Sequence, residues 1–87
     1  MHEFSLINDL MRKIAAIATE QKAEKVTSVT VRLGALAHIS ADHFREHFVH
    51  AARNTVADGA QLKVLTSTDE ADPRAQDILL ESVDVAD

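Results

Sequence analysis

Residues 28–34 read Ser28-Val29-Thr30-Val31-Arg32-Leu33-Gly34, a regular alternation of polar and aliphatic side chains. Successive side chains of a strand point to opposite faces, so Val29, Val31 and Leu33 share one face. The stretch therefore predicts a strand with one buried face. Gly34 ends the alternation and can adopt backbone angles that other residues avoid.

An amphipathic helix is predicted before this strand, over residues 5–23. Its aliphatic residues recur at steps of three and four, which places them on one side of a helix. They are Leu6, Ile7, Leu10, Met11, Ile14, Ile17 and Ala18. Ser5 is a candidate N-cap, and Lys22 and Lys25 suit the negative end of the helix dipole.

A second helix is predicted after the strand, over residues 41–56. Ser40 is its candidate N-cap, and Asp42 places a negative charge in its first turn. Its apolar side is formed by Phe44, Phe48, Ala51, Ala52 and Thr55.

Two further strands are predicted in the second half of the chain. Asp58-Gly59 indicates a turn, after which residues 61–66 alternate as a strand. Residues 67–77 are polar, contain Pro73 and predict a loop. Residues 78–85 predict the third strand. The whole chain, residues 1–87, then forms a single α+β domain in the order helix-strand-helix-strand-strand. Packing both helices on one face of the three-stranded sheet would bury both apolar stripes.

Composition excludes several classes of function. The chain has no Cys, so it has neither disulfides nor thiolate metal ligands. The formal net charge of -5 argues against a nucleic-acid partner. No apolar run approaches the roughly 20 residues that span a bilayer, and the N-terminus has no secretory signal pattern. We therefore expect a cytoplasmic protein without a membrane or nucleic-acid partner. The absence of a nucleophile beside a base indicates that it is not an enzyme.

The N-terminal residues Met1-His2-Glu3 offer one set of metal ligands. A free Met1 amine, the His2 amide nitrogen and the His2 imidazole can chelate one ion through two fused rings. The Glu3 carboxylate, another amide or water could complete a plane, which suits Ni(II) or Cu(II) better than tetrahedral Zn(II). The alternative is a frayed terminus with no metal role.

His43, His47 and His50 form a second candidate set. Their spacing places all three along one face of the predicted second helix, and two His at i, i+4 can share a metal. The alternative is that these imidazoles are half-buried beside the Phe44–Phe48 stripe without a ligand. His38 is expected in a surface loop. The acidic residues Asp69, Glu70 and Asp72 are expected to be solvated.

Several segments, in the same order, resemble the HypA/HybF family of hydrogenase-maturation proteins. The opening Met1-His2-Glu3-Phe4-Ser5-Leu6 is similar to the family's N-terminal signature. Residues 29–36 resemble its first strand and Gly-Ala-Leu turn, and Phe44-Arg45 and Phe48 match its second helix. Arg53, Thr55 and residues 57–62 resemble the segment that leads into its second strand, and residues 78–85 its last strand.

The resemblance implies a nickel metallochaperone that assists Ni(II) insertion into a [NiFe]-hydrogenase. By this resemblance the Met1 amine, His2 and Glu3 would hold Ni(II). The implied partners are a hydrogenase large subunit and the nickel-loading GTPase of the pathway, and family members are not enzymes.

One departure from the family is large. The family places two Cys-x-x-Cys pairs with a structural zinc between its second and third strands, where this chain has the short loop 67–77. We therefore expect no zinc at that position. A naturally reduced homologue and a chain from which the module was removed both fit the sequence. The departure leaves a second hypothesis open: a metal-free adaptor in hydrogenase maturation. Its exposed sheet edges could pair with a partner or with a second copy in a homodimer.

Overall fold

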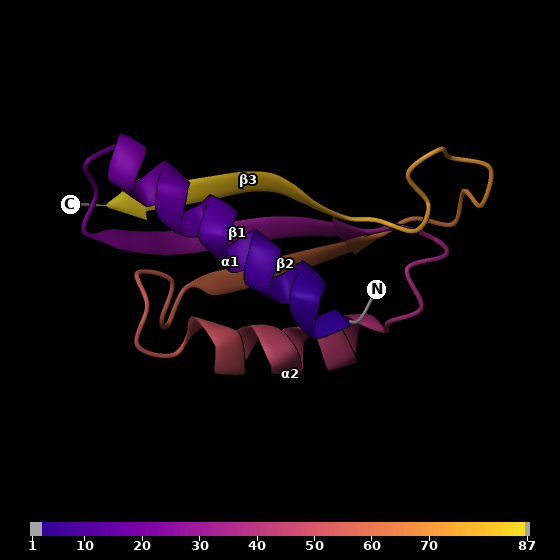
Figure 1. Cartoon of the computed structure of the whole chain (residues 1–87), viewed down its shortest axis with the longest axis horizontal. Coiled ribbons are helices and arrows are strands. Elements are labelled where there is room, and N and C mark those ends of the chain that lie inside the picture. The colour runs from indigo at the N-terminus through magenta and orange to yellow at the C-terminus, as the bar shows by residue number, and fades with distance from the viewer. Residues whose placement is uncertain (1–2, 87) are drawn as a thin grey trace.

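The structure, a computed structural model, describes residues 3–86 and confirms the predicted α+β class and element order. The elements are α1 (Glu3–Glu20), β1 (Lys25–Leu33), α2 (Ala41–Ala52), β2 (Gln61–Thr66) and β3 (Ile78–Ala86). Figure 1 shows α1 crossing the sheet diagonally, with α2 running along its lower edge. Within residues 3–86, no helix combines the length and the apolar character needed to cross a membrane.

The sheet is mixed, with the strand order β2-β1-β3. β1 and β2 are parallel, with Ser28 opposite Gln61 and Leu33 opposite Thr66. They are parallel because α2 lies in the connection between them and returns the chain to the same end of the sheet. β3 pairs antiparallel to the other side of β1, with Leu33 opposite Ile78. β1 is therefore the central strand, which explains why its alternation is the most regular in the sequence.

The core lies between one face of this sheet and the two helices. Val29, Val31 and Leu33 are each at most 2 % exposed, as the alternation predicts. The two helices bury the stripes that face them, formed by Ile7, Leu10, Ile14 and Ala18 of α1 and by Phe44, Phe48 and Ala52 of α2. Because the core is assembled from both helices and the sheet, neither helix can move independently of the rest.

The end of α1 differs from the prediction. The helix ends at Glu20, not at residue 23, because Lys22 takes a left-handed conformation with φ of 55°. The Lys22 amide donates to the carbonyl of Thr19 at 3.0 Å, and the Ala23 amide donates to that of Ala18 at 2.9 Å. This pair of hydrogen bonds satisfies the last carbonyls of the helix and reverses the chain toward β1.

Two other predictions about α1 were wrong. The helix begins at Glu3, so Ser5 lies inside its first turn and is not the N-cap. Lys25 is the first residue of β1, so only Lys22 lies near the negative end of the helix dipole.

The end of α2 was also predicted too late. The helix stops at Ala52 because Arg53 has a non-helical ψ of 129° and Asn54 then adopts a left-handed conformation with φ of 65°. Thr55, expected on the apolar side of the helix, lies in the following turn. Its hydroxyl donates to the Ala52 carbonyl at 2.6 Å and accepts from the Ala57 amide at 3.1 Å.

Gly34 is required for a different reason from the one predicted. Among the described glycines, Gly59 has the positive φ, at 79°, whereas Gly34 does not. A Cβ atom on Gly34 would instead collide with the backbone carbonyl of Ala75. The loop 67–77 therefore packs directly against the end of β1, where the Gly34 amide donates to the Asp77 carbonyl at 2.9 Å.

Candidate metal site on helix α2

The N-terminal end of α2 is fixed by the cap that the sequence predicts. The Ser40 hydroxyl accepts a hydrogen bond from the His43 amide at 3.1 Å, and Asp42 lies in the first turn. This bond satisfies one amide that has no partner within the helix, and the carboxylate favours the positive end of the helix dipole. His43 thus lies on a well-defined first turn.

His43 and His47 are brought together on this helix. Their Nε2 atoms lie 2.8 Å apart, and their ring centroids are separated by 4.5 Å. The separation of one helical turn places both side chains on the same face, as their spacing predicts. His43 is exposed and His47 is half-buried, so the expected position beside the phenylalanine stripe holds only for His47.

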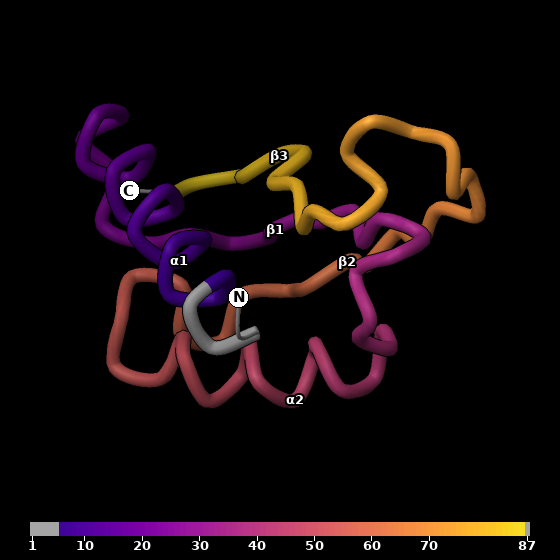
Figure 2. The backbone as a smooth tube through the Cα atoms, turned by 45° about the vertical axis from the view of Figure 1, so that its right-hand side comes forward, coloured from indigo at the N-terminus to yellow at the C-terminus, as the bar shows by residue number. Residues whose placement is uncertain are grey.

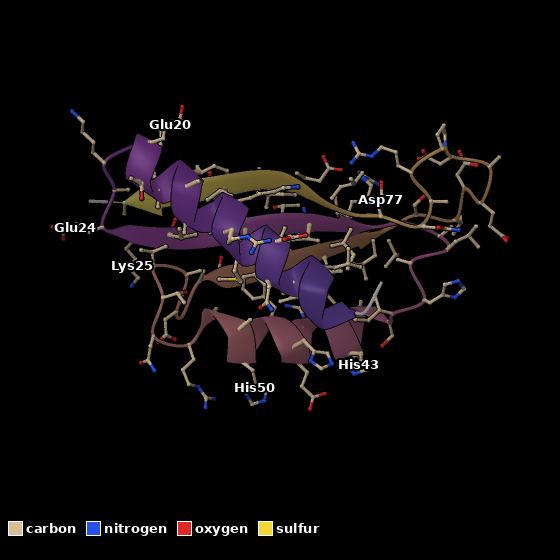
Figure 3. The ribbon with its side chains drawn as sticks, viewed as in Figure 1. Glu20, Glu24, Lys25, His43, His50 and Asp77 are labelled. Atoms are coloured by element: carbon tan, nitrogen blue, oxygen red, sulfur yellow. The ribbon has the colours of Figure 1, made fainter. Side chains whose placement is uncertain are left out.

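His50 does not join this pair. It is exposed, and Figure 3 shows it further along α2 than His43. In the described part of the chain, no three His, Asp or Glu side chains are grouped so that they could hold a metal ion. The structure therefore brings together two of the three predicted histidines. His38 is exposed in the connection before α2, as expected for a loop residue, with a φ of 58°.

Arg45 helps to hold α2 in position, a role that its place in the sequence does not indicate. Its guanidinium Nη1 donates to the Leu62 carbonyl of β2 at 2.7 Å. The inward-facing Phe44 and Phe48 hold the helix from the core side, at 0 % and 2 % exposure. A side chain-to-backbone contact between a helix and an edge strand has no sequence pattern that identifies it.

The N-terminal ligand set lies at the limit of the described chain. Met1 and His2 are outside the described residues, and Glu3 is described only as the first residue of α1. The helices α1 and α2 pack in one core and lie side by side in the ribbon and tube views (Figures 1 and 2). Figure 3 shows His43 on α2.

The acidic loop is organised by its own backbone. Asp69 Oδ1 accepts from the Ala71 amide at 3.0 Å, and Asp72 Oδ1 accepts from the Arg74 amide at 2.9 Å. Short side chains of this type commonly close turns in this way. These two carboxylates therefore shape the loop between β2 and β3.

The fold and these contacts define a small two-layer α+β domain that presents paired imidazole nitrogens on an exposed helix. A family model described as "Hydrogenase/urease nickel incorporation, metallochaperone, hypA" matches residues 1–73. The chain is 38% identical over 74 residues to hydrogenase maturation factor HypA of Archaeoglobus fulgidus, covering 85% of this chain and 66% of that protein. It is also 38% identical over 64 residues to HypA of Chlorobium phaeobacteroides, covering 74% of this chain and 57% of that protein.

Solved structures share the same fold. The solution structure of the Ni metallochaperone HypA from Helicobacter pylori matches with a TM-score of 0.83 at 17% identity, covering 99% of this chain and 98% of that one. A second solution structure of a HypA protein matches with a TM-score of 0.75 at 18% identity, covering 98% and 96% of the two chains.

This chain belongs to the HypA family of nickel metallochaperones in hydrogenase maturation. It spans about half to two thirds of the length of the curated relatives described above.

Proposed function

We propose that this chain binds Ni(II) through its N-terminal residues and delivers it during maturation of a [NiFe]-hydrogenase. Its membership in the nickel-incorporation family is the observation that carries the proposal. The ligands would be the Met1 amine, the His2 amide and imidazole, and Glu3, which immediately precede or begin α1.

The chemistry of these donors suits nickel. The amine and a deprotonated amide nitrogen close a five-membered ring with the metal, and the His2 imidazole closes a second ring onto the same ion. A plane of nitrogen donors, completed by Glu3, another amide or water, suits Ni(II) and fits tetrahedral Zn(II) poorly. The chain contains no Cys, so the cysteine-bound zinc of the family has no ligands here.

The remaining parts of the proposal follow from the family. We propose that the protein acts in the cytoplasm by binding and transfer, without catalysing a reaction. Its partners would be a nickel-loading GTPase and a hydrogenase large subunit. Self-association through the edge strands β2 and β3 stays a prediction that analytical ultracentrifugation can test.

The experiment that tests this function is a calorimetric Ni(II) titration of tag-free protein with a native N-terminus. We expect the tightest equivalent of Ni(II) to be lost in His2→Ala and in protein with an acetylated amine, because each change removes a chelating nitrogen. A variant with alanine at His43, His47 and His50 should retain it. Unchanged tight binding in both N-terminally altered proteins would place the nickel elsewhere in the chain and overturn the N-terminal ligand set. Absence of tight binding in the unaltered protein would support the metal-free adaptor hypothesis.

Nickel affinity should also depend on pH. An ordinary N-terminal amine has a pKa of about 7.7–8.0, so nearly every amine carries a proton that nickel must displace at pH 6, whereas at least about half of the amines are already deprotonated at pH 8. Protonation of the amine alone should weaken binding about 40-fold at pH 6 relative to pH 8. Competition titrations at the two pH values measure this change, and equal affinities would exclude the amine as a ligand.

A further inference from the structure

The imidazoles of His43 and His47 have a geometry that goes beyond a packing contact. Their Nε2 atoms face each other at 2.8 Å. In the metal-free protein, the Nε2–H of one ring can donate to the Nε2 lone pair of the other. A metal ion bound by both rings would replace that hydrogen bond, with both imidazoles then in the Nδ1–H tautomer.

We propose that His43 and His47 form a metal site of their own, which takes one Ni(II) or Cu(II) ion independently of the N-terminal ligands. Metal–imidazole bonds are about 2.0–2.1 Å long, so two nitrogens 2.8 Å apart subtend an angle of about 86° at a shared ion. A tetrahedral ion would need them about 3.3–3.4 Å apart. The two nitrogens are thus already close enough to share an ion once both rings turn their lone pairs toward it. Imidazole nitrogens suit Cu(II) and Ni(II), whose square-planar or tetragonal geometry places neighbouring donors at about this separation.

Three contacts hold the part of the α2 backbone that carries the two imidazoles. Ser40 caps the first turn, Arg45 ties α2 to β2, and the phenylalanine pair anchors the helix in the core. Because a site built on a rigid element keeps its donor spacing, less reorganisation is needed when the ion binds. His43 is exposed, so an ion can reach the pair from solvent.

The overall charge of the chain also favours a cation, because its formal net charge is -5. Among the side chains that the structure describes, those of residues 6–86, no third His, Asp or Glu completes the set. Water or an incoming ligand would therefore fill the other coordination positions, which makes the site open and exchangeable.

The test uses protein whose N-terminal ligands are disabled, with an acetylated amine and His2→Ala, so that its outcome is independent of the proposed function. We expect this protein to bind one equivalent of Ni(II), and also of Cu(II), in a calorimetric titration. His43→Ala and His47→Ala should each weaken binding at least about tenfold, a loss that even outer-shell partners of metal ligands cause. His50→Ala is the matched control on the same helix and should bind as the parent protein does.

A second measurement locates the ion directly. Substoichiometric Cu(II) should broaden the imidazole NMR signals of His43 and His47 before those of His38 and His50, because paramagnetic broadening falls steeply with distance. Circular dichroism of each variant establishes that α2 is intact. The proposal is overturned if the blocked protein binds neither ion, if His50→Ala weakens binding as much as His43→Ala, or if all four imidazoles broaden together.

Discussion

Replacing Gly34 by alanine is expected to destabilise the protein by about 3 kcal/mol or more, a severe effect for a single methyl group. The new Cβ would collide with the Ala75 carbonyl, which is backbone and cannot rotate away. Relief requires the loop to separate from β1, which breaks the bonds from the Gly34 amide to Asp77 and from the Leu36 amide to Ala75. Each contributes about 1 kcal/mol, and Ala75, only 4 % exposed, would lose its burial.

Urea denaturation followed by circular dichroism measures this loss. A domain of this size has a free energy of unfolding of about 4–13 kcal/mol, so the Gly34→Ala variant should unfold at a clearly lower urea concentration. Gly59→Ala is the matched control, because Gly59 has a φ of 79° but nothing within 4 Å of an added Cβ. The Gly59→Ala variant should lose only about 1 kcal/mol of its free energy of unfolding, because of backbone strain. Equal losses at the two glycines would show that the contact with Ala75 is not tight.

The close contact between Gly34 and Ala75 bears on how this chain differs from the HypA/HybF pattern. The loop 67–77 stands where the HypA/HybF resemblance places a zinc module, and it is held by backbone hydrogen bonds to the end of β1 and by its own aspartate-closed turns. The strands β2 and β3 are thus connected on either side of β1 without a metal. These contacts thus connect β2 to β3 without any cysteine.

Periodicity was sufficient to predict the elements but not their ends. Burial of Ile7, Leu10 and Ile14 follows from steps of three and four, since only one side of a helix faces the sheet. The helix ends depend instead on single residues with positive φ, Lys22 and Asn54. Either residue can also be accommodated within a helix, so local sequence does not identify it as the stop.

Strand pairing could not be derived from the sequence analysis. The alternation in β1 specifies which side chains are buried, but it does not specify which strand lies on which side. The order β2-β1-β3 follows from the whole chain: α2 forces a parallel return for β2, and the loop 67–77 crosses to the other edge. The irregularities in register between β1 and β3 have no marker in the sequence.

For the candidate metal ligands, too, the sequence predicted some of the observed arrangement and not the rest. Spacing alone brings His43 and His47 together, because four residues make about one helical turn. His50 lies seven residues from His43, a rise of about 10 Å, which keeps these two side chains apart. It also follows His47 by three residues, a spacing that favours contact, so spacing did not predict that His50 stays outside the pair. For Met1, His2 and Glu3 the assignment depends on backbone chemistry and family resemblance, and the first two lie outside the described residues.

Replacing Phe44 by alanine is expected to cost about 3–5 kcal/mol, the usual loss for a fully buried phenylalanine. Phe44 is 0 % exposed, and its ring lies 6.2 Å from that of Phe48 between α2 and the sheet. Against a free energy of unfolding of about 4–13 kcal/mol this loss is large, so the melting temperature should fall steeply and the unfolded fraction at 37 °C should rise. Thermal denaturation followed by circular dichroism measures the effect.

The same substitution separates the two metal sites. The N-terminal ligands are consecutive residues, so a partly unfolded chain retains them, whereas the His43–His47 spacing exists only while α2 is helical. Nickel binding to Phe44→Ala should therefore keep the N-terminal equivalent and lose the second in proportion to the unfolded fraction. Val49→Ala, at a 55 % exposed position of the same helix, should change stability by less than about 0.5 kcal/mol and preserve both equivalents. If Phe44→Ala melts α2 yet retains the second equivalent, those two imidazoles do not depend on the helix for their geometry.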